Sequence, residues 1–157
     1  MAATVDAYYE KTGALRPHAN TNYNGRTIGV WAANPNGKAD AENGALVMHA
    51  EKDQFAAMTR VTPSIVGGAV LEFEARSATK SPISVQWTSS AQANFSQPQL
   101  KPVPLFNDWK KCRVDMPFGG RIGQLRFVLR DAGWQADIRN VRLLTPQGTV
   151  MTKYEFY

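Results

Sequence analysis

Residues 69–76 read AVLEFEAR, and the alternation of apolar and charged residues in this stretch decides the fold class. The apolar residues Leu71, Phe73 and Ala75 alternate with charged residues, so an extended chain points the two sets to opposite sides. Strict period-two alternation is typical of a strand that has one buried face and one polar face. The stretch therefore predicts a β-strand that borders a core.

Further short runs of β-forming residues follow the same logic, and Gly, Pro or Asn residues separate them. They cover residues 45–49, 55–61, 83–88, 109–116, 124–130 and 135–144, with an isolated strand-like island at 27–32. In the last run Ile138 and Val141 are both apolar but three apart, which requires a bulge near Arg139 and Asn140.

Two connections have a composition of their own. Residues 89–108 contain three prolines and no clear period, so we expect a long connection with one short edge strand. Residues 119–123 read GGRIG and lie between two predicted strands. We interpret them as a hairpin turn, because a phosphate-binding loop needs a helix behind it.

About eight strands predict an all-β fold, an antiparallel β-sandwich of the jelly-roll type. We expect one domain over residues 1–157, with a loop-rich segment at 1–43.

The 157-residue chain is 43% hydrophobic and 20% charged, with a net charge of +5. These proportions exclude a wholly disordered chain, and no apolar run approaches the roughly 20 residues of a membrane span. The positive charge favours acidic partners such as nucleic acid, anionic lipid or acidic polysaccharide. The single cysteine, Cys112, excludes an internal disulfide and a cysteine-based zinc site, and we expect a buried thiol.

Glu72 and Glu74 share one strand face at a spacing of roughly 6.5–7 Å. Such a pair suits acid and base work on a glycosidic bond. The same pair also arises wherever a strand turns its polar side to water. No Gly-x-Ser-x-Gly motif for a nucleophile occurs in the chain. We therefore expect a protein that is not an enzyme, and a sandwich-fold glycosidase is the least favoured alternative.

Aromatic residues in polar segments indicate a ligand that stacks on their rings, because the residues of an apolar core do not normally come from such segments. A sugar ring presents an apolar face to an aromatic ring, while its hydroxyls bond amides, carboxylates and guanidinium groups. We predict a groove in which three aromatic residues are stacking platforms, Tyr23, Trp31 and Trp134, and three polar residues are hydrogen-bonding partners, Glu74, Gln86 and Arg126. Replacing Trp31 or Trp134 with alanine should then weaken glycan binding at an unchanged melting temperature. Trp87 and Trp109 are expected to plug the edges of the sandwich instead.

Several stretches together resemble the jelly-roll carbohydrate-binding modules of the galactose-binding-like superfamily. They are NGALVM at 43–48, GAVLEFEAR at 68–76 with ISVQW at 83–87, DWKK at 108–111, GQLRF at 123–127 and DIRNVRL at 137–143. The resemblance covers roughly residues 43–145. Such modules often hold a structural calcium with an acidic residue directly after the isoleucine of the last strand. Arg139 stands at that position here and Asp137 lies one residue before Ile138, so we expect no cofactor.

The resemblance implies a non-catalytic module that binds a polysaccharide or oligosaccharide. It also implies a secreted or cell-surface protein, with the module covalently linked to a catalytic domain of a carbohydrate-active enzyme. An acidic polysaccharide would fit the positive charge, whereas nucleic acid and membrane partners are not expected. The alternative is a structural or adhesive jelly roll of a capsid, tail or surface protein, which works through protein–protein contacts.

Overall fold

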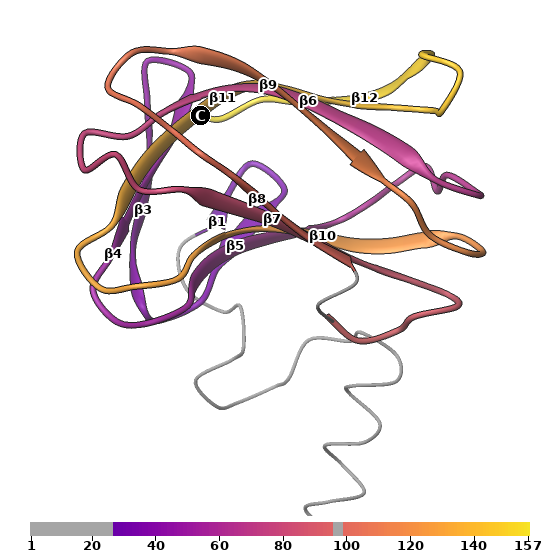
Figure 1. Ribbon diagram of the computed structural model, residues 1–157, viewed down its shortest axis with the longest axis horizontal. Helices are drawn as coiled ribbons and strands as arrows, with labels where there is room; N and C mark the ends of the chain where they lie inside the picture. Colours follow the sequence, from indigo (N-terminus) through magenta and orange to yellow (C-terminus); the bar gives the residue numbers. More distant parts are fainter. Residues whose placement is uncertain (1–26, 96–98) are drawn as a thin grey trace, which may run out of the picture.

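The computed structural model describes residues 27–95 and 99–157, which form two antiparallel β-sheets packed face to face (Figure 1). Sheet A, the lower layer of the figure, has the order β1-β2-β5-β10-β7-β8. Its strands are β1 (Thr27–Ile28), β2 (Trp31–Ala33), β5 (Phe55–Arg60), β7 (Ile83–Ser89), β8 (Leu100–Val103) and β10 (Ile122–Leu129). The all-β sandwich expected from the sequence is confirmed.

Sheet B forms the upper layer and has the order β3-β4-β11-β6-β9, with β12 paired to the end of β11 (Figure 1). Its strands are β3 (Gly37–Glu42), β4 (Ala45–Ala50), β6 (Ala69–Arg76), β9 (Lys110–Met116), β11 (Gln135–Leu144) and β12 (Val150–Tyr154). The described ranges thus hold twelve strands where the sequence predicted about eight. The predicted loop-rich segment contributes β1, β2 and β3 from residue 27 onward.

The core lies between the two sheets and consists of the inward side chains that the alternation predicted. Leu71, Phe73 and Ala75 of β6 are buried there. Trp87 of β7 is also buried, and its Nε1 donates a hydrogen bond to the Pro117 carbonyl at 3.3 Å. Cys112 is a buried free thiol, and desolvation by this burial raises its pKa. The prediction for Cys112 is confirmed, and Trp87 is a core residue and not part of an exposed surface.

Local backbone features explain two of the sequence signals. Asn43 and Gly44 form the two-residue turn between β3 and β4, with positive φ values of 53° and 80°. This turn suits Asn-Gly because its mirror-image geometry needs positive φ at both central residues. In β11 the pairing with β6 shifts between Arg139 and Arg142, and Asn140 has a φ of 54°. The predicted bulge is confirmed.

The glycine-rich stretch 119–123 is not a hairpin turn, and that prediction was wrong. The chain leaves β9 of sheet B before this stretch and enters β10 of sheet A within it, so the connection crosses between the sheets. Ile122 and Gly123 already belong to β10. Sequence patterns locate such a break in the alternation, but they do not reveal which sheet the next strand joins.

Candidate functional site

The outer face of sheet B carries acidic and basic side chains that form ion pairs with one another. Arg76 pairs with Asp137 at 2.8 Å, and Arg139 pairs with Glu74 at 3.1 Å. Glu72 receives both Arg142 and Arg113, the latter at 3.6 Å. A hollow of about 480 Å³ is lined by Glu72, Glu74, Arg113 and Arg142 among others. Any ligand here would compete with the ion pairs that the protein already makes.

Glu74 on this face is held in its charged form. The side-chain hydrogen bond from Asn140 lowers its pKa below the ordinary 4.5, and Arg139 lowers it further by hydrogen bonding and charge, against the opposing effect of desolvation. A glycosidase acid needs the opposite shift, because it must carry a proton near neutral pH. Glu72 is in turn bound by two guanidinium groups. Glu72 and Glu74 therefore belong to a structural network of ion pairs.

The outer face of sheet A differs because its outward side chains are largely uncharged and buried. Ala56, Met58 and Val128 form a small apolar cluster, against which Phe95 packs. Four polar side chains, of Ser84, Gln86, Thr88 and Gln124, are also buried. An outward sheet face normally meets water, so this combination of apolar and polar side chains distinguishes the sheet A face from an ordinary surface.

The strand register places the central residues of this face. Arg126 of β10 lies between Met58 of β5 and Gln86 of β7, and Gln86 lies opposite Leu100 of β8. Period-two alternation along β7 and β10 points Gln86 and Arg126 away from the core. Nε and Nη2 of Arg126 both donate hydrogen bonds to Oε1 of Gln86, at 3.0 and 2.5 Å. The amide thus fixes the orientation of the guanidinium group.

Phe95 completes this arrangement from the long connection after β7. The guanidinium carbon of Arg126 lies 3.9 Å from the centre of the Phe95 ring, a close cation–π contact. The turn from Ser89 to Gln92, which begins the connection, is closed by backbone hydrogen bonds of 2.8 and 3.1 Å. At its end, Nε2 of Gln99 donates to the Trp87 carbonyl at 2.8 Å. Both flanks of the segment that carries Phe95 are therefore tied to β7.

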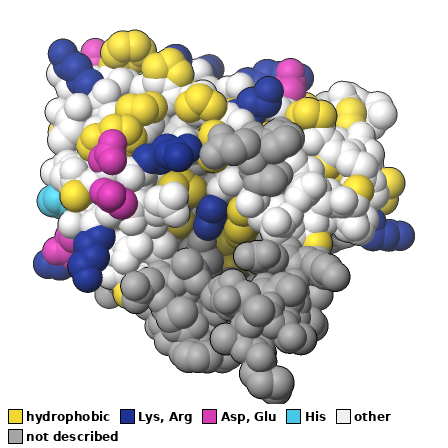
Figure 2. Space-filling model, turned by 60° about the horizontal axis from the view of Figure 1, so that its bottom comes forward, with side chains coloured by type: hydrophobic (Ala, Val, Ile, Leu, Met, Phe, Trp, Pro, Cys, Tyr) yellow, Lys and Arg dark blue, Asp and Glu magenta, His cyan; other side chains and the backbone are white. Residues whose placement is uncertain are grey.

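A hollow of about 380 Å³ opens over these groups. Its lining consists of one aromatic, two basic, two amide and two aliphatic residues: Phe95, Arg126, Arg130, Gln54, Gln86, Leu100 and Val128. Figure 2 brings this side of the molecule forward and shows hydrophobic and basic side chains next to each other near its middle. The visible acidic side chains lie towards the left and upper margins. The hollow therefore combines an aromatic ring with basic and amide side chains.

Gln124 adds an unsatisfied donor beside the hollow. Its side chain is 3% exposed, and Nε2 finds no hydrogen-bond partner in the described part of the chain. Its backbone N–H donates to Oγ1 of Thr88 at 2.8 Å, which holds β10 against β7 at the irregular pairing between Ile122 and Leu125. A buried amide without a partner costs free energy.

Of the five predicted site residues that the structure describes, it brings together two, Gln86 and Arg126. Glu74 lies on sheet B, on the opposite outer face of the sandwich. Trp134 packs partly buried against the core at the turn before β11. Tyr23 lies outside the described residues.

The prediction of Trp31 as a stacking platform is wrong. Its side chain is 1% exposed, and its ring stacks on Phe127 at 5.2 Å and meets Tyr154 edge-on at 5.2 Å. It belongs to the core because β2 pairs with β5 and turns Trp31 inward. No face of the indole ring is left for a ligand.

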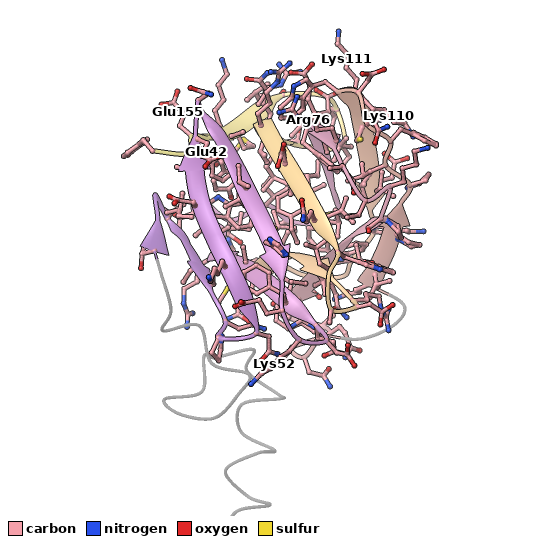
Figure 3. All side chains as sticks on the ribbon, turned by 90° about the vertical axis from the view of Figure 1, so that its left-hand side faces the viewer. Glu42, Lys52, Arg76, Lys110, Lys111 and Glu155 are labelled. Atoms are coloured by element: carbon pink, nitrogen blue, oxygen red, sulfur yellow. The ribbon has the colours of Figure 1, made fainter. Side chains whose placement is uncertain are left out.

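The prediction that Trp109 plugs an edge of the sandwich is also wrong. Two guanidinium groups, of Arg76 and Arg139, lie 4.5 and 3.9 Å from the centre of its ring. The ring therefore belongs to the charged outer face of sheet B. Arg76, Lys110 and Lys111 are seen at the same end of that sheet in Figure 3.

Sequence reasoning missed Phe95 and Leu100 as site residues. Both lie in the segment 89–108, whose prolines and lack of period gave no indication of which way a side chain points. The three prolines did indicate a long irregular connection, and binding residues concentrate in such connections next to a sheet. Among the residues that the structure describes, no group of three or more His, Cys, Asp or Glu side chains could hold a metal ion. No helix in the same residues could cross a bilayer.

No protein-family model matches the chain, and no curated protein is similar to it. Solved structures are similar in fold. A family 29 carbohydrate-binding module complexed with mannohexaose is 13% identical over 80% of this chain and 84% of its own, with a TM-score of 0.59. A second family 29 structure, complexed with cellulohexaose, is 12% identical with the same coverage and TM-score. A family 4 carbohydrate-binding module is 16% identical over 73% of this chain and 93% of its own, also with a TM-score of 0.59. The chain therefore has the β-sandwich jelly-roll fold of the family 4 and family 29 carbohydrate-binding modules.

Proposed function

We propose that this protein is a non-catalytic carbohydrate-binding domain and that its ligand binds in the hollow on sheet A. One observation carries the proposal, the meeting of the Phe95 ring, the Arg126 guanidinium and the Gln86 amide in one hollow. Sugar recognition needs an apolar surface for the ring and fixed polar groups for the hydroxyls. The mannohexaose and cellulohexaose complexes of modules with the same fold support this proposal.

The roles of the three groups follow from their surroundings. Phe95 is half-buried and gives the sugar ring an apolar face. Arg126 supplies planar N–H donors, which suit the vicinal hydroxyls of a sugar. Gln86 is 5% exposed, so it acts mainly as a positioning residue for Arg126. No bond is made or broken, because the acidic pair of sheet B lies on the other outer face and is held in ion pairs.

The experiment is a binding titration of the full chain against soluble oligosaccharides, beginning with mannohexaose and cellulohexaose. Phe95→Ala should lower the affinity about tenfold, because an aromatic contact of this type contributes about 1–1.5 kcal/mol. Phe106→Ala is the matched control. Phe106 is 54% exposed, lies beneath Nζ of Lys110 at 5.4 Å and is not part of the hollow.

The outcomes separate the proposal from its alternatives. Unchanged binding by Phe95→Ala would move the site away from sheet A. A chain that binds no glycan and forms a stable oligomer in light scattering would favour a structural or adhesive role and overturn the proposal.

Extracellular placement and linkage to a catalytic domain belong to the same proposal. They are supported by the fold shared with carbohydrate-binding modules. An antibody against this domain, used on the medium, surface and interior fractions of the source cells, tests both points. We expect a band larger than the domain in an extracellular fraction. A band confined to the interior fraction would refute this placement.

A further inference from the structure

The two sheets differ in how they carry charge. Along the six strands of sheet A, the charged residues are Arg60, Lys101 and Arg126, and no strand of this sheet contains an Asp or a Glu. The strands of sheet B contain six acidic residues, Asp40, Glu42, Glu72, Glu74, Asp115 and Asp137. The same strands also contain eight basic residues, so the net charge is similar on the strands of the two sheets, and the difference is that acidic residues occur only on those of sheet B.

Each described ion pair joins two residues of sheet B. The hollow on sheet A is lined by two basic residues, Arg126 and Arg130, and by no carboxylate. Arg130 is exposed, and no ion pair joins it to an acid within the ranges 27–95 and 99–157. The acids nearest to the hollow in sequence are Asp53 and Asp131, beside lining residues but outside the lining itself.

The two arginines lie four residues apart, Arg126 within the central strand β10 and Arg130 directly after it. Arg126 is oriented by Gln86 and Phe95. Arg130 follows the end of β10, and its backbone carbonyl accepts a hydrogen bond from the Gln54 N–H at 3.2 Å, which fixes the backbone at that position. Residues 126, 128 and 130 share one face of an extended chain, so both guanidinium groups lie over the same hollow with Val128 between them.

We propose that the hollow on sheet A selects glycans that carry carboxylate or sulfate groups. This inference rests on the proposed function and names its substrate class. Arg130 binds the anionic group, because a guanidinium group matches carboxylate and sulfate oxygens with two parallel hydrogen bonds. Phe95 and Arg126 hold the sugar ring and its hydroxyls. A neutral glycan would leave the charge of Arg130 unused in a hollow that contains no carboxylate among its lining residues.

The test compares three classes of soluble probe at equal chain length: a neutral mannooligosaccharide, an oligouronate and a sulfated oligosaccharide. Titrations in 20 mM and 500 mM NaCl should show that one of the anionic probes binds at least about tenfold more tightly than the neutral probe at low salt. This preference should shrink at high salt, because salt screens exposed charges. The uronate and sulfate arms show which anionic group is recognised.

Arg130→Gln should weaken binding of the preferred anionic probe about tenfold or more, since a hydrogen-bonded charge pair is lost. Lys111→Gln is the matched control, because it removes the same charge from an exposed position of sheet B. Lys111 lies near the start of β9 and extends away from the molecule in Figure 3. Equal losses in the two variants would mean attraction by net charge alone and would overturn the inference.

The remaining outcomes distinguish this inference from the proposed function. Binding of the neutral probe that depends on Phe95 but not on salt or Arg130 would overturn the inference and leave the proposed function standing. Binding of none of the three classes would overturn both.

Discussion

Replacing Trp31 with alanine should destabilise the protein strongly. The side chain is 1% exposed, and three other rings surround it: Phe127 and Tyr154 at 5.2 Å each and Phe156 at 6.1 Å. Truncation of a buried aromatic residue to alanine costs about 3–5 kcal/mol, because transfer free energy is lost and a cavity remains. At roughly 2–4 °C per kcal/mol for a chain of this size, the melting temperature should fall by roughly 6–20 °C.

Thermal unfolding followed by circular dichroism provides the assay, with two further variants as controls. Trp31→Phe keeps a ring in the core and removes Nε1–H, a buried donor without a partner in the described residues, so its loss should be smaller. Val30→Ala alters the adjacent residue, which is 66% exposed, and should stay within about 0.5 kcal/mol of the parent. A Trp31→Ala protein that melts within 2 °C of the parent, in roughly the range of a surface change, would refute this assignment of Trp31 to the core.

Three further predictions follow from the described pKa shifts and burial. The pKa of Glu74 is lowered, so its charged form stabilises the fold above pH 4.5, and this stabilisation is lost as the pH falls through the folded-state pKa. Asn140→Gly should raise the pKa of Glu74, as measured by a carboxyl NMR titration. An unchanged pKa would contradict the role of the Asn140 hydrogen bond. Burial raises the pKa of Tyr154 to about 12, so the stability of the fold should decrease as the pH rises from about 10 to 12. A Tyr154→Phe variant should lack this decrease. It should also be at least as stable as the parent at pH 7, because it loses a buried hydroxyl that has no partner among the described residues. Cys112 should react slowly with a thiol reagent in the native state and rapidly in denaturant; equal rates would show that the thiol is accessible.

The strands were predictable where one face of each strand is apolar. The segment 69–76 gave β6 without error, and 135–144 gave β11 with its bulge, because a buried face imposes period two on the sequence. The strands β3 and β12 were missed. β3 reads GKADAE and has only one buried side chain, Ala39, so little apolar alternation marks it. It becomes a strand because the Asn43–Gly44 turn pairs it with β4.

Trp31 shows why the polar character of a segment is a weak guide to burial. The tryptophan lies among asparagines and small residues in the sequence, which favoured an exposed position. In the fold, three residues of β2 suffice to pair with β5 and to point the indole ring into the core. Burial was therefore decided by a pairing partner about 25 residues away in the chain, and no local pattern carries that information.

The candidate site required a second kind of information that alternation does not contain. In a sandwich, an outward side chain can point to either of two opposite outer faces, and period two distinguishes only inward from outward. Gln86, Arg126 and Glu74 were all correctly predicted to point outward, yet the first two lie on sheet A and the third on sheet B. Only the strand order assigns them. That same order also separates the ion-paired surface of sheet B from the hollow of sheet A, so the topology, rather than the overall charge of +5, determines on which outer face the proposed ligand site lies.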